Sequence, residues 1–143
     1  MAYESQGGLN TGTVMLPGLV AGSGLTAATA QFKFVRLTGE RTVTLVSNVN
    51  QAPIGVLQEP VLATGDPVTV MARGLTKVQL AAGSPSAGGI IGADGNGQAA
   101  VLSIPAAGSY QCGVLIEAAA GAAVAAGVIG TALINCIPTG LAK

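Results

Sequence analysis

The 143-residue sequence contains no histidine and no tryptophan, and aromatic residues make up only 3% of it. It therefore lacks the one side chain whose ordinary pKa allows it to exchange protons near neutral pH. Charged residues make up only 8% of the chain, whereas an average globular domain carries about 25%. A surface with so few charges is expected to be partly covered by neighbouring molecules. These absences favour a structural protein and argue against an enzyme.

The chain also lacks an excess of positive charge. Six Lys and Arg are balanced by six Asp and Glu, so the net charge is zero. Affinity for DNA or RNA comes largely from basic side chains that neutralise phosphates, and the basic residues here form no dense run: Lys33, Arg36, Arg41, Arg73, Lys77 and Lys143. The sequence therefore predicts no direct binding of nucleic acid.

Long apolar runs are few, and one of them requires a membrane test. No charged residue occurs from Ala118 to Leu141, which is long enough to span a bilayer. However, Ala and Gly dominate this run, and it lacks the density of Leu, Ile and Phe that drives insertion. We predict a turn over residues 119–127, with a short helix as an alternative over residues 118–126, followed by a buried strand over residues 128–136, and no membrane segment. The N-terminus has no basic region before an apolar core, which predicts synthesis in the cytoplasm.

Only two cysteines are present, Cys112 and Cys136, both in segments with the pattern of strands. Two interpretations stay open. In a reducing cytosol they are two small buried hydrophobic residues, and in an oxidising compartment they could form a disulfide. The cytoplasmic origin favours the first.

What the chain does contain is an internal repeat. The segment from Pro53 to Pro60 returns as the segment from Gln111 to Ala118, so that Gly55 matches Gly113 and Glu59 matches Glu117 at an offset of 58 (113 − 55). The same offset matches Gly39 with Gly97 and Val43 with Val101. Repeats of this kind are typical of two copies of one β-unit that share a core.

Short strands separated by turn residues predict the fold class. Strands are expected over residues 31–37 and 42–46 as a hairpin, and then over 54–57, 67–72, 76–80, 98–102, 110–116 and 128–136. This spacing predicts an all-β fold, a compact small barrel or sandwich built from two related units. Residues 1–24 show no sustained period, so we expect an extended N-terminal arm outside a β-rich domain of residues 25–143.

Three motifs in the sequence are candidates for chemical sites. Glu59 and Glu117 could act as a pair of carboxylates, but repeat-related positions more often end strands or satisfy turns. The segment Asp94-Gly-Asn-Gly97 resembles the start of a calcium loop but lacks the further ligands, so it predicts a hairpin turn. Gly88 and Gly89 are not followed by a Lys and a helix, which excludes a phosphate loop. The sequence predicts no catalytic, cofactor or metal site.

An ordered series of segments resembles the small capsid cement, or decoration, proteins of tailed bacteriophages. It covers residues 26–137 through segments 34–39, 52–57, 63–70, 74–78, 93–97, 113–119 and 128–136. The resemblance implies a β-rich domain, commonly a homotrimer, on the outer surface of the virion. There it binds the major capsid protein and stabilises the head against the pressure of internal DNA. It transfers no catalytic residue.

For such a protein, an arm that becomes ordered on contact could hold adjacent capsid subunits. Its apolar residues are then the expected capsid contacts: Leu9, Val14, Met15, Leu16, Leu19 and Val20. A tail without a role is the alternative for this segment. For the whole chain, a trimeric fibre-base or surface-adhesin module is the second candidate and a small hydrolase the third. The long repetitive shaft of a fibre and the convergent polar groups of an enzyme are both missing from the sequence.

Overall fold

The structure is a computed structural model that describes residues 13–26, 29–83, 86–102, 109–118 and 125–136. All the regular secondary structure in these ranges is β-strand, which confirms the predicted all-β class. The nine strands are β1 Val14–Ala21, β2 Phe34–Gly39, β3 Thr42–Leu45, β4 Gly55–Leu57, β5 Pro67–Gln79, β6 Ile90–Ala93, β7 Ala99–Val101, β8 Gly113–Glu117 and β9 Ile129–Asn135.

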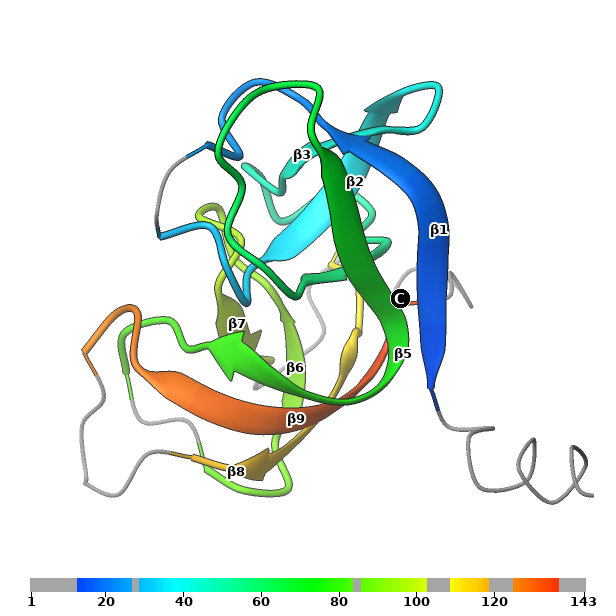
Figure 1. Ribbon diagram of the computed structural model, residues 1–143. Coiled ribbons are helices and arrows are strands. Elements are labelled where there is room, and N and C mark those ends of the chain that lie inside the picture. The colour runs from blue at the N-terminus through cyan, green and yellow to red at the C-terminus, as the bar shows by residue number, and fades with distance from the viewer. Residues whose placement is uncertain (1–12, 27–28, 84–85, 103–108, 119–124, 137–143) are drawn as a thin grey trace, which may run out of the picture.

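Five strands close a small barrel in the order β1-β3-β2-β4-β5, because β5 returns to pair with β1 (Figure 1). The closing contact runs antiparallel from Val14 opposite Arg73 to Val20 opposite Pro67. On its other side β1 pairs in parallel with β3, with Val20 opposite Thr42. Closure leaves no free strand edge in this barrel.

The remaining strands extend the sheet from the second half of β5 in the order β9-β8-β6-β7. This part also curls back on itself, because Leu80 forms a parallel bridge with Ala99 of β7. Ala81 then donates its N–H to the carbonyl of Ala99 at 2.9 Å. We call the part up to Ala72 the first unit and the part from Arg73 onward the second unit; in Figure 1, β5 runs from one into the other.

Strand pairing confirms the repeat and extends it to β1. Val35 lies opposite Gly55, as Ile91 lies opposite Gly113. The β2–β3 and β6–β7 hairpins match at an offset of 56 (91 − 35), so that Val43 matches Ala99 and not Val101, and Gly97 matches Arg41 and not Gly39. In the same way, β1 against the first half of β5 matches the second half of β5 against β9.

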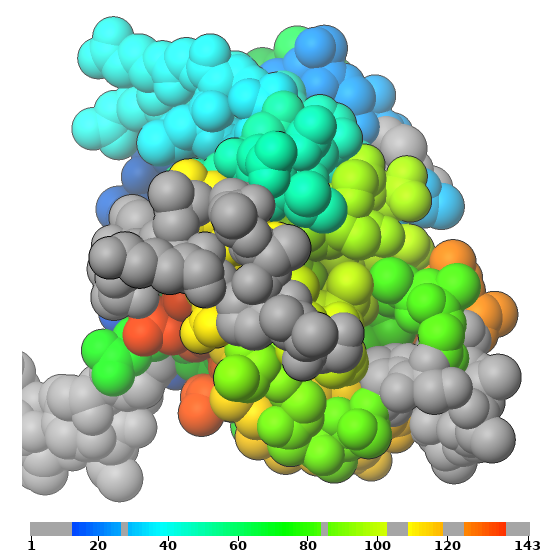
Figure 2. Space-filling model, turned by 180° about the vertical axis from the view of Figure 1, so that it is seen from behind, coloured from blue at the N-terminus to red at the C-terminus, as the bar shows by residue number. Residues whose placement is uncertain are grey.

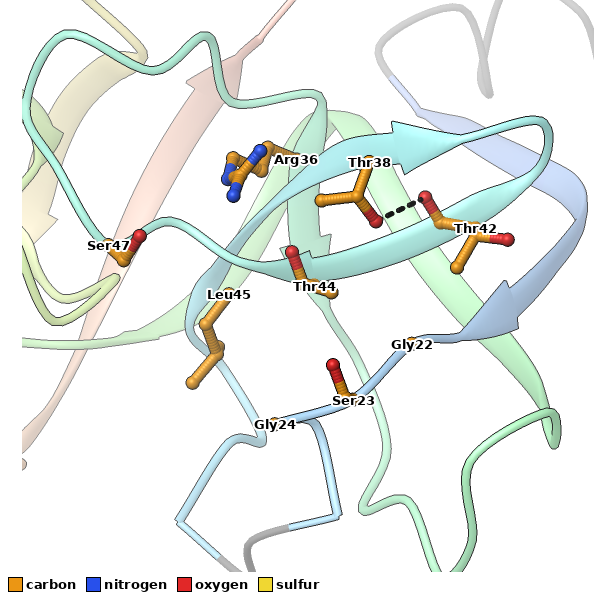
Figure 3. Close-up of a pocket in the computed structure, with 9 residues that line it drawn as sticks. All are labelled: Gly22, Ser23, Gly24, Arg36, Thr38, Thr42, Thr44, Leu45 and Ser47. Carbon is orange, nitrogen blue, oxygen red and sulfur yellow. Dashed lines mark hydrogen bonds between the residues drawn. The ribbon is translucent and has the colours of Figure 1, made fainter.

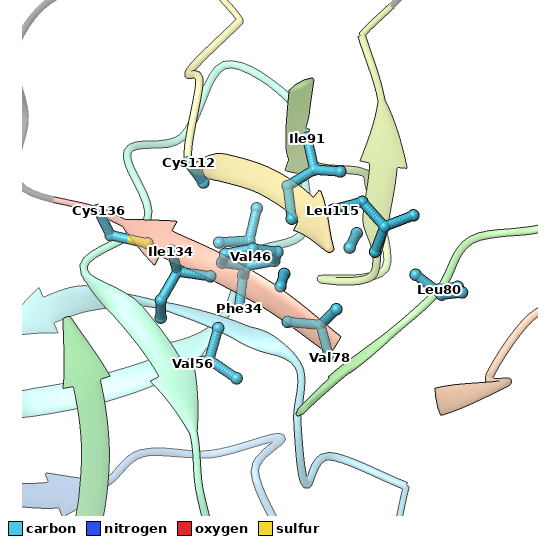
Figure 4. Close-up of a cluster of buried hydrophobic side chains, with 12 residues drawn as sticks. Phe34, Val46, Val56, Val78, Leu80, Ile91, Cys112, Leu115, Ile134 and Cys136 are labelled. Atoms are coloured by element: carbon cyan, nitrogen blue, oxygen red, sulfur yellow. The ribbon is translucent and has the colours of Figure 1, made fainter. Parts of the chain in front are cut away.

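Each unit has its own buried core, built from matching positions. In the first unit the core contains Leu19, Ala21, Val35, Val43, Leu57 and Val70. Their counterparts are Val78, Leu80, Ile91, Ala99, Leu115 and Ala132, which lie in the second cluster. That cluster also includes Phe34, Val46 and Val56 from the first unit (Figure 4). The two units therefore pack together through one continuous apolar contact.

The N-terminal segment differs from the predicted arm. Its described part from Val14 onward is strand β1, and Leu19 and Ala21 are buried in the core of the first unit. A register shift between Leu16 and Leu19 surrounds Gly18, whose φ of 72° favours glycine. This irregularity breaks the alternation of apolar and polar residues, which explains why the sequence pattern did not indicate a strand.

Strand β5, Pro67–Gln79, is one long strand where the sequence predicted two. Arg73 and Gly74 do not make a turn, because each keeps a partner in β9. At this point the pairing partner of β5 changes from β1 to β9. A continuous strand therefore forms more backbone hydrogen bonds than a turn would. The predicted strand over residues 128–136 is confirmed as β9, but it is buried on one face only, with Ile129 and Leu133 exposed. Residues 119–124 of the predicted turn or short helix lie outside the described residues.

Candidate functional site

The predicted capsid contacts lie mainly on β1. Leu19 is buried, and Leu16 packs against the same core. Val14 and Val20 are half-buried, while Met15 is 41% exposed on the outer face of the barrel. Leu9 lies outside the described residues. Among the described members of this set, Met15 therefore offers the largest apolar contact to another molecule.

The two repeat-related glutamates occupy matching places in different units. The Glu59 carboxylate accepts hydrogen bonds from the backbone N–H of Thr69 at 3.0 Å and from its hydroxyl at 2.8 Å. Glu117 lies opposite Thr131, the counterpart of Thr69. Glu117 ends β8 and Glu59 follows β4 by two residues, so each carboxylate serves its own unit and the structure does not bring them together as an acid–base pair.

The segment Asp94-Gly-Asn-Gly97 is a hairpin turn, as predicted. Asp94 Oδ1 accepts from the backbone N–H of Asn96 and of Gln98, both at 2.8 Å. Gly97 takes a φ of 72°, which suits the end of such a turn. Across the described ranges, no group of three or more acidic or cysteine side chains converges as a metal site would require.

A hollow of about 470 Å³ lies on the outer face of the β2–β3 hairpin (Figure 3). Arg36 and Thr44 face each other across the two strands, and Arg36 Nε and Thr44 Oγ1 are buried without a hydrogen-bond partner. Most other side chains around it are small or carry hydroxyls: Gly22, Ser23, Gly24, Thr38, Thr42, Leu45 and Ser47. The hydroxyls of this hollow have no histidine or carboxylate beside them in its lining, so it contains no activated nucleophile.

The two cysteines are buried, as predicted, and their thiols are free in the structure and lie within hydrogen-bond reach of each other. Cys112 Sγ donates to the carbonyl of Tyr110 at 3.6 Å. A hydrogen bond with Cys112 raises the pKa of the Cys136 thiol, and burial raises it further. Cys136 therefore stays protonated and is unsuited to act as a nucleophile.

This raised pKa predicts a loss of stability at alkaline pH. The unfolded chain loses the Cys136 proton above the ordinary value of 9.0, while the folded protein keeps it. The free energy of unfolding should therefore fall above that pH by up to about 1.4 kcal/mol per pH unit. Urea unfolding between pH 7 and pH 10 measures this slope. Cys136→Ala should reduce it, and an equal slope in both proteins would contradict the assignment.

A row of exposed apolar side chains crosses the second unit, and the sequence patterns did not predict it. In register from β5 to β6, Leu75 lies opposite Leu133, Leu133 opposite Val114, and Val114 opposite Ile90. Leu75, Leu133 and Ile90 are exposed, and Val114 is half-exposed. We call these four residues the apolar row. Only the cross-strand register reveals it, because its members come from four separate segments of the sequence.

A smaller hollow of about 230 Å³ lies beside the apolar row. Ile90 and Val114 line it together with Gln111, Gly113 and Asn135. Its walls are thus partly apolar, and it is large enough to receive a side chain from another molecule. The apolar row and this hollow form the best candidate for a docking surface among the described residues.

Comparison with known proteins adds no family to these observations. No protein-family model matches the chain, and no curated protein matches it. Within the described part of the chain, no helix is both long enough and apolar enough to cross a bilayer.

Proposed function

We propose that the protein is a structural cement protein that binds the outside of an icosahedral phage head. In this proposal its partner is the major capsid protein, and it acts as a homotrimer on the virion surface after synthesis in the host cytoplasm. Its work is to add many modest contacts over a closed lattice, so that weak interfaces together resist the pressure of packaged DNA.

The main observation in favour is a surface poor in charge that carries exposed apolar side chains on a sheet. Large contiguous apolar patches on soluble proteins commonly mark interaction sites. Two β-units that share the continuous strand β5 form a compact body, which suits a load-bearing role. The resemblance of residues 26–137 to cement proteins points in the same direction.

Shell binding is the direct test. Purified protein is added to DNA-filled heads that lack it, occupancy is measured by cryo-EM, and the temperature of DNA release is recorded. We expect saturable occupancy and a higher release temperature. Absence of binding to heads, or binding to free DNA that weakens steeply with added salt, would contradict the proposal.

A point variant tests β1 as the shell contact. Met15→Glu places a charge that must lose its water on contact, so occupancy at limiting protein should fall about tenfold. Val49→Glu is the matched control, because Val49 is exposed to a similar extent, 46% against 41%, but lies in the loop between β3 and β4. Equal occupancy for both variants would exclude Met15 as a contact.

A further inference from the structure

Because the two units are related by the repeat, the apolar row has a matching set of four residues in the first unit. Its counterparts there are Met15, Met71, Val56 and Phe34, which lie opposite one another across β1, β5, β4 and β2. Phe34 and Val56 are 0% exposed, whereas their counterpart Ile90 is 42% exposed and Val114 is half-exposed. The part of this face on β2 and β4 is therefore covered in the first unit, while Met15 at its β1 end stays 41% exposed, and the matching face of the second unit is open on β5, β9 and β6.

The second unit provides the cover for the face of the first. Its β6–β7 hairpin turn reaches Phe34, whose backbone N–H donates to the carbonyl of Gly97 at 2.7 Å. A Cβ at Gly97 would lie only 3.0 Å from the carbonyl oxygen of Phe34, so the two backbones are in close contact. Ala93 packs against the cluster that contains Phe34 and Val56. The contact inside the chain thus joins an apolar sheet face to the β6–β7 hairpin of the following unit and to buried residues of that unit, among them Cys112, Ile134 and Cys136.

Among the described residues, the matching hairpin of the first unit packs on no second sheet face, and its Arg41 carbonyl accepts from the backbone N–H of Val20 in the neighbouring strand β1 at 2.8 Å. In register, Leu37 corresponds to Ala93, and Arg41 corresponds to Gly97. Leu37 is 48% exposed, and the turn from Leu37 to Arg41 is exposed throughout. Figure 2 shows this hairpin, in cyan, projecting from one corner of the molecule. The described part of each chain thus carries an open face, the apolar row, and an open hairpin.

We propose that a second copy of this chain docks on the apolar row, with its β2–β3 hairpin placed as the β6–β7 hairpin is placed on the first unit. Leu37 of the second copy would then approach the row and the hollow beside it. The arrangement continues from chain to chain the interface that the two units make within one chain. Because face and hairpin are different surfaces, the contact is head-to-tail and produces a ring when its rotation closes.

This docking does not depend on the proposed cement function, because it follows from strand register and exposure alone. The charge-poor composition is consistent with it, since burying the apolar row desolvates few ionised groups. Among the described residues, the most exposed large apolar side chain is that of Leu62, at 89%, which lies between β4 and β5 and belongs to neither surface. It therefore provides the matched control.

The test uses the full chain in sedimentation velocity and native mass spectrometry. Wild type should form a closed oligomer. Leu133→Glu on the face and Leu37→Asp on the hairpin should each weaken association about 30-fold or more, while Leu62→Glu should assemble as wild type does. Circular dichroism and thermal unfolding check that every variant is folded, which is expected because the changed side chains are exposed.

Mixing the two variants tests the head-to-tail geometry. The Leu133→Glu variant keeps an intact hairpin, and the Leu37→Asp variant keeps an intact face. The hairpin of the first can therefore still dock on the face of the second. An equal mixture should therefore form dimers with one copy of each, and nothing larger. Their different masses identify the composition of the dimer.

Three results would overturn the proposal: a wild-type protein that stays monomeric up to millimolar concentration, folded single variants that assemble like wild type, or a mixture without mixed dimers. A monomeric wild type whose binding to phage heads is lost in Leu133→Glu would instead assign the apolar row to the shell. In that case binding to the shell would stand, while self-docking and the homotrimer in solution would fail.

Discussion

Removal of residues 1–24 is expected to destroy the first barrel. β1 lies between β3 and β5, and without it the barrel opens along both strands. The deletion also removes Leu19 and Ala21 from the core. Loss of a buried aliphatic side chain with the cavity that it leaves costs about 2–5 kcal/mol, and the lost strand pairing adds to this. Urea unfolding followed by circular dichroism should show loss of the wild-type transition.

A shorter deletion is the control for this experiment. Removing residues 1–12 keeps all of β1, so the protein should unfold at the same urea concentration as wild type. A deletion of residues 1–24 that kept the wild-type midpoint would show that β1 is dispensable for the fold. It would then support the arm predicted from the sequence.

Substitution of either repeat-related glycine is the second change with a large expected effect. A Cβ at Gly113 would overlap the carbonyl oxygen of Leu133 and lie 2.8 Å from Cα of Ile134. A Cβ at Gly55 would overlap the carbonyl oxygen of Met71, the counterpart of Leu133, and lie 2.6 Å from Cγ1 of Val70. Because backbone atoms of a central strand cannot move aside cheaply, Gly55→Ala and Gly113→Ala should each reduce the free energy of unfolding by about 3 kcal/mol.

Gly39→Ala is the control for the glycine pair. A Cβ there would meet Cβ of Thr42 at 3.8 Å, an ordinary contact, so its effect should stay within about 0.5 kcal/mol. Denaturant midpoints of the three variants measure the difference. If all three variants have the same denaturant midpoint, close approach of the strands is not the reason for the repeated glycine.

The two glycines also give a physical reason for this part of the repeat. Gly55 and Gly113 occur at matching positions because each lets one strand approach the carbonyl of its neighbour in the same way. A glycine recurring at one offset therefore marks a packing requirement that both units share. Sequence comparison within the chain detected this pair correctly.

Other parts of the fold were predicted less accurately from the sequence. Val43 matches Ala99 in the structure, because the hairpins are offset by 56 residues and not by 58. Strand β1 was missed because the irregularity around Gly18 interrupts its alternation. The unbroken course of β5 was missed because Arg73 and Gly74 have the local composition of a turn, while their pairing with β9 is a long-range contact.

The sequence by itself determined the all-β class, the two related units, the hairpin turn at Asp94 and the absence of histidine chemistry. These follow from local residue patterns, which depend only on near neighbours in the chain. Only the tertiary structure decided that β1 closes the first barrel, that Phe34 and Val56 are covered, and that the apolar row is open. These depend on register between strands far apart in sequence, and a shift of one residue would turn each side chain to the opposite face.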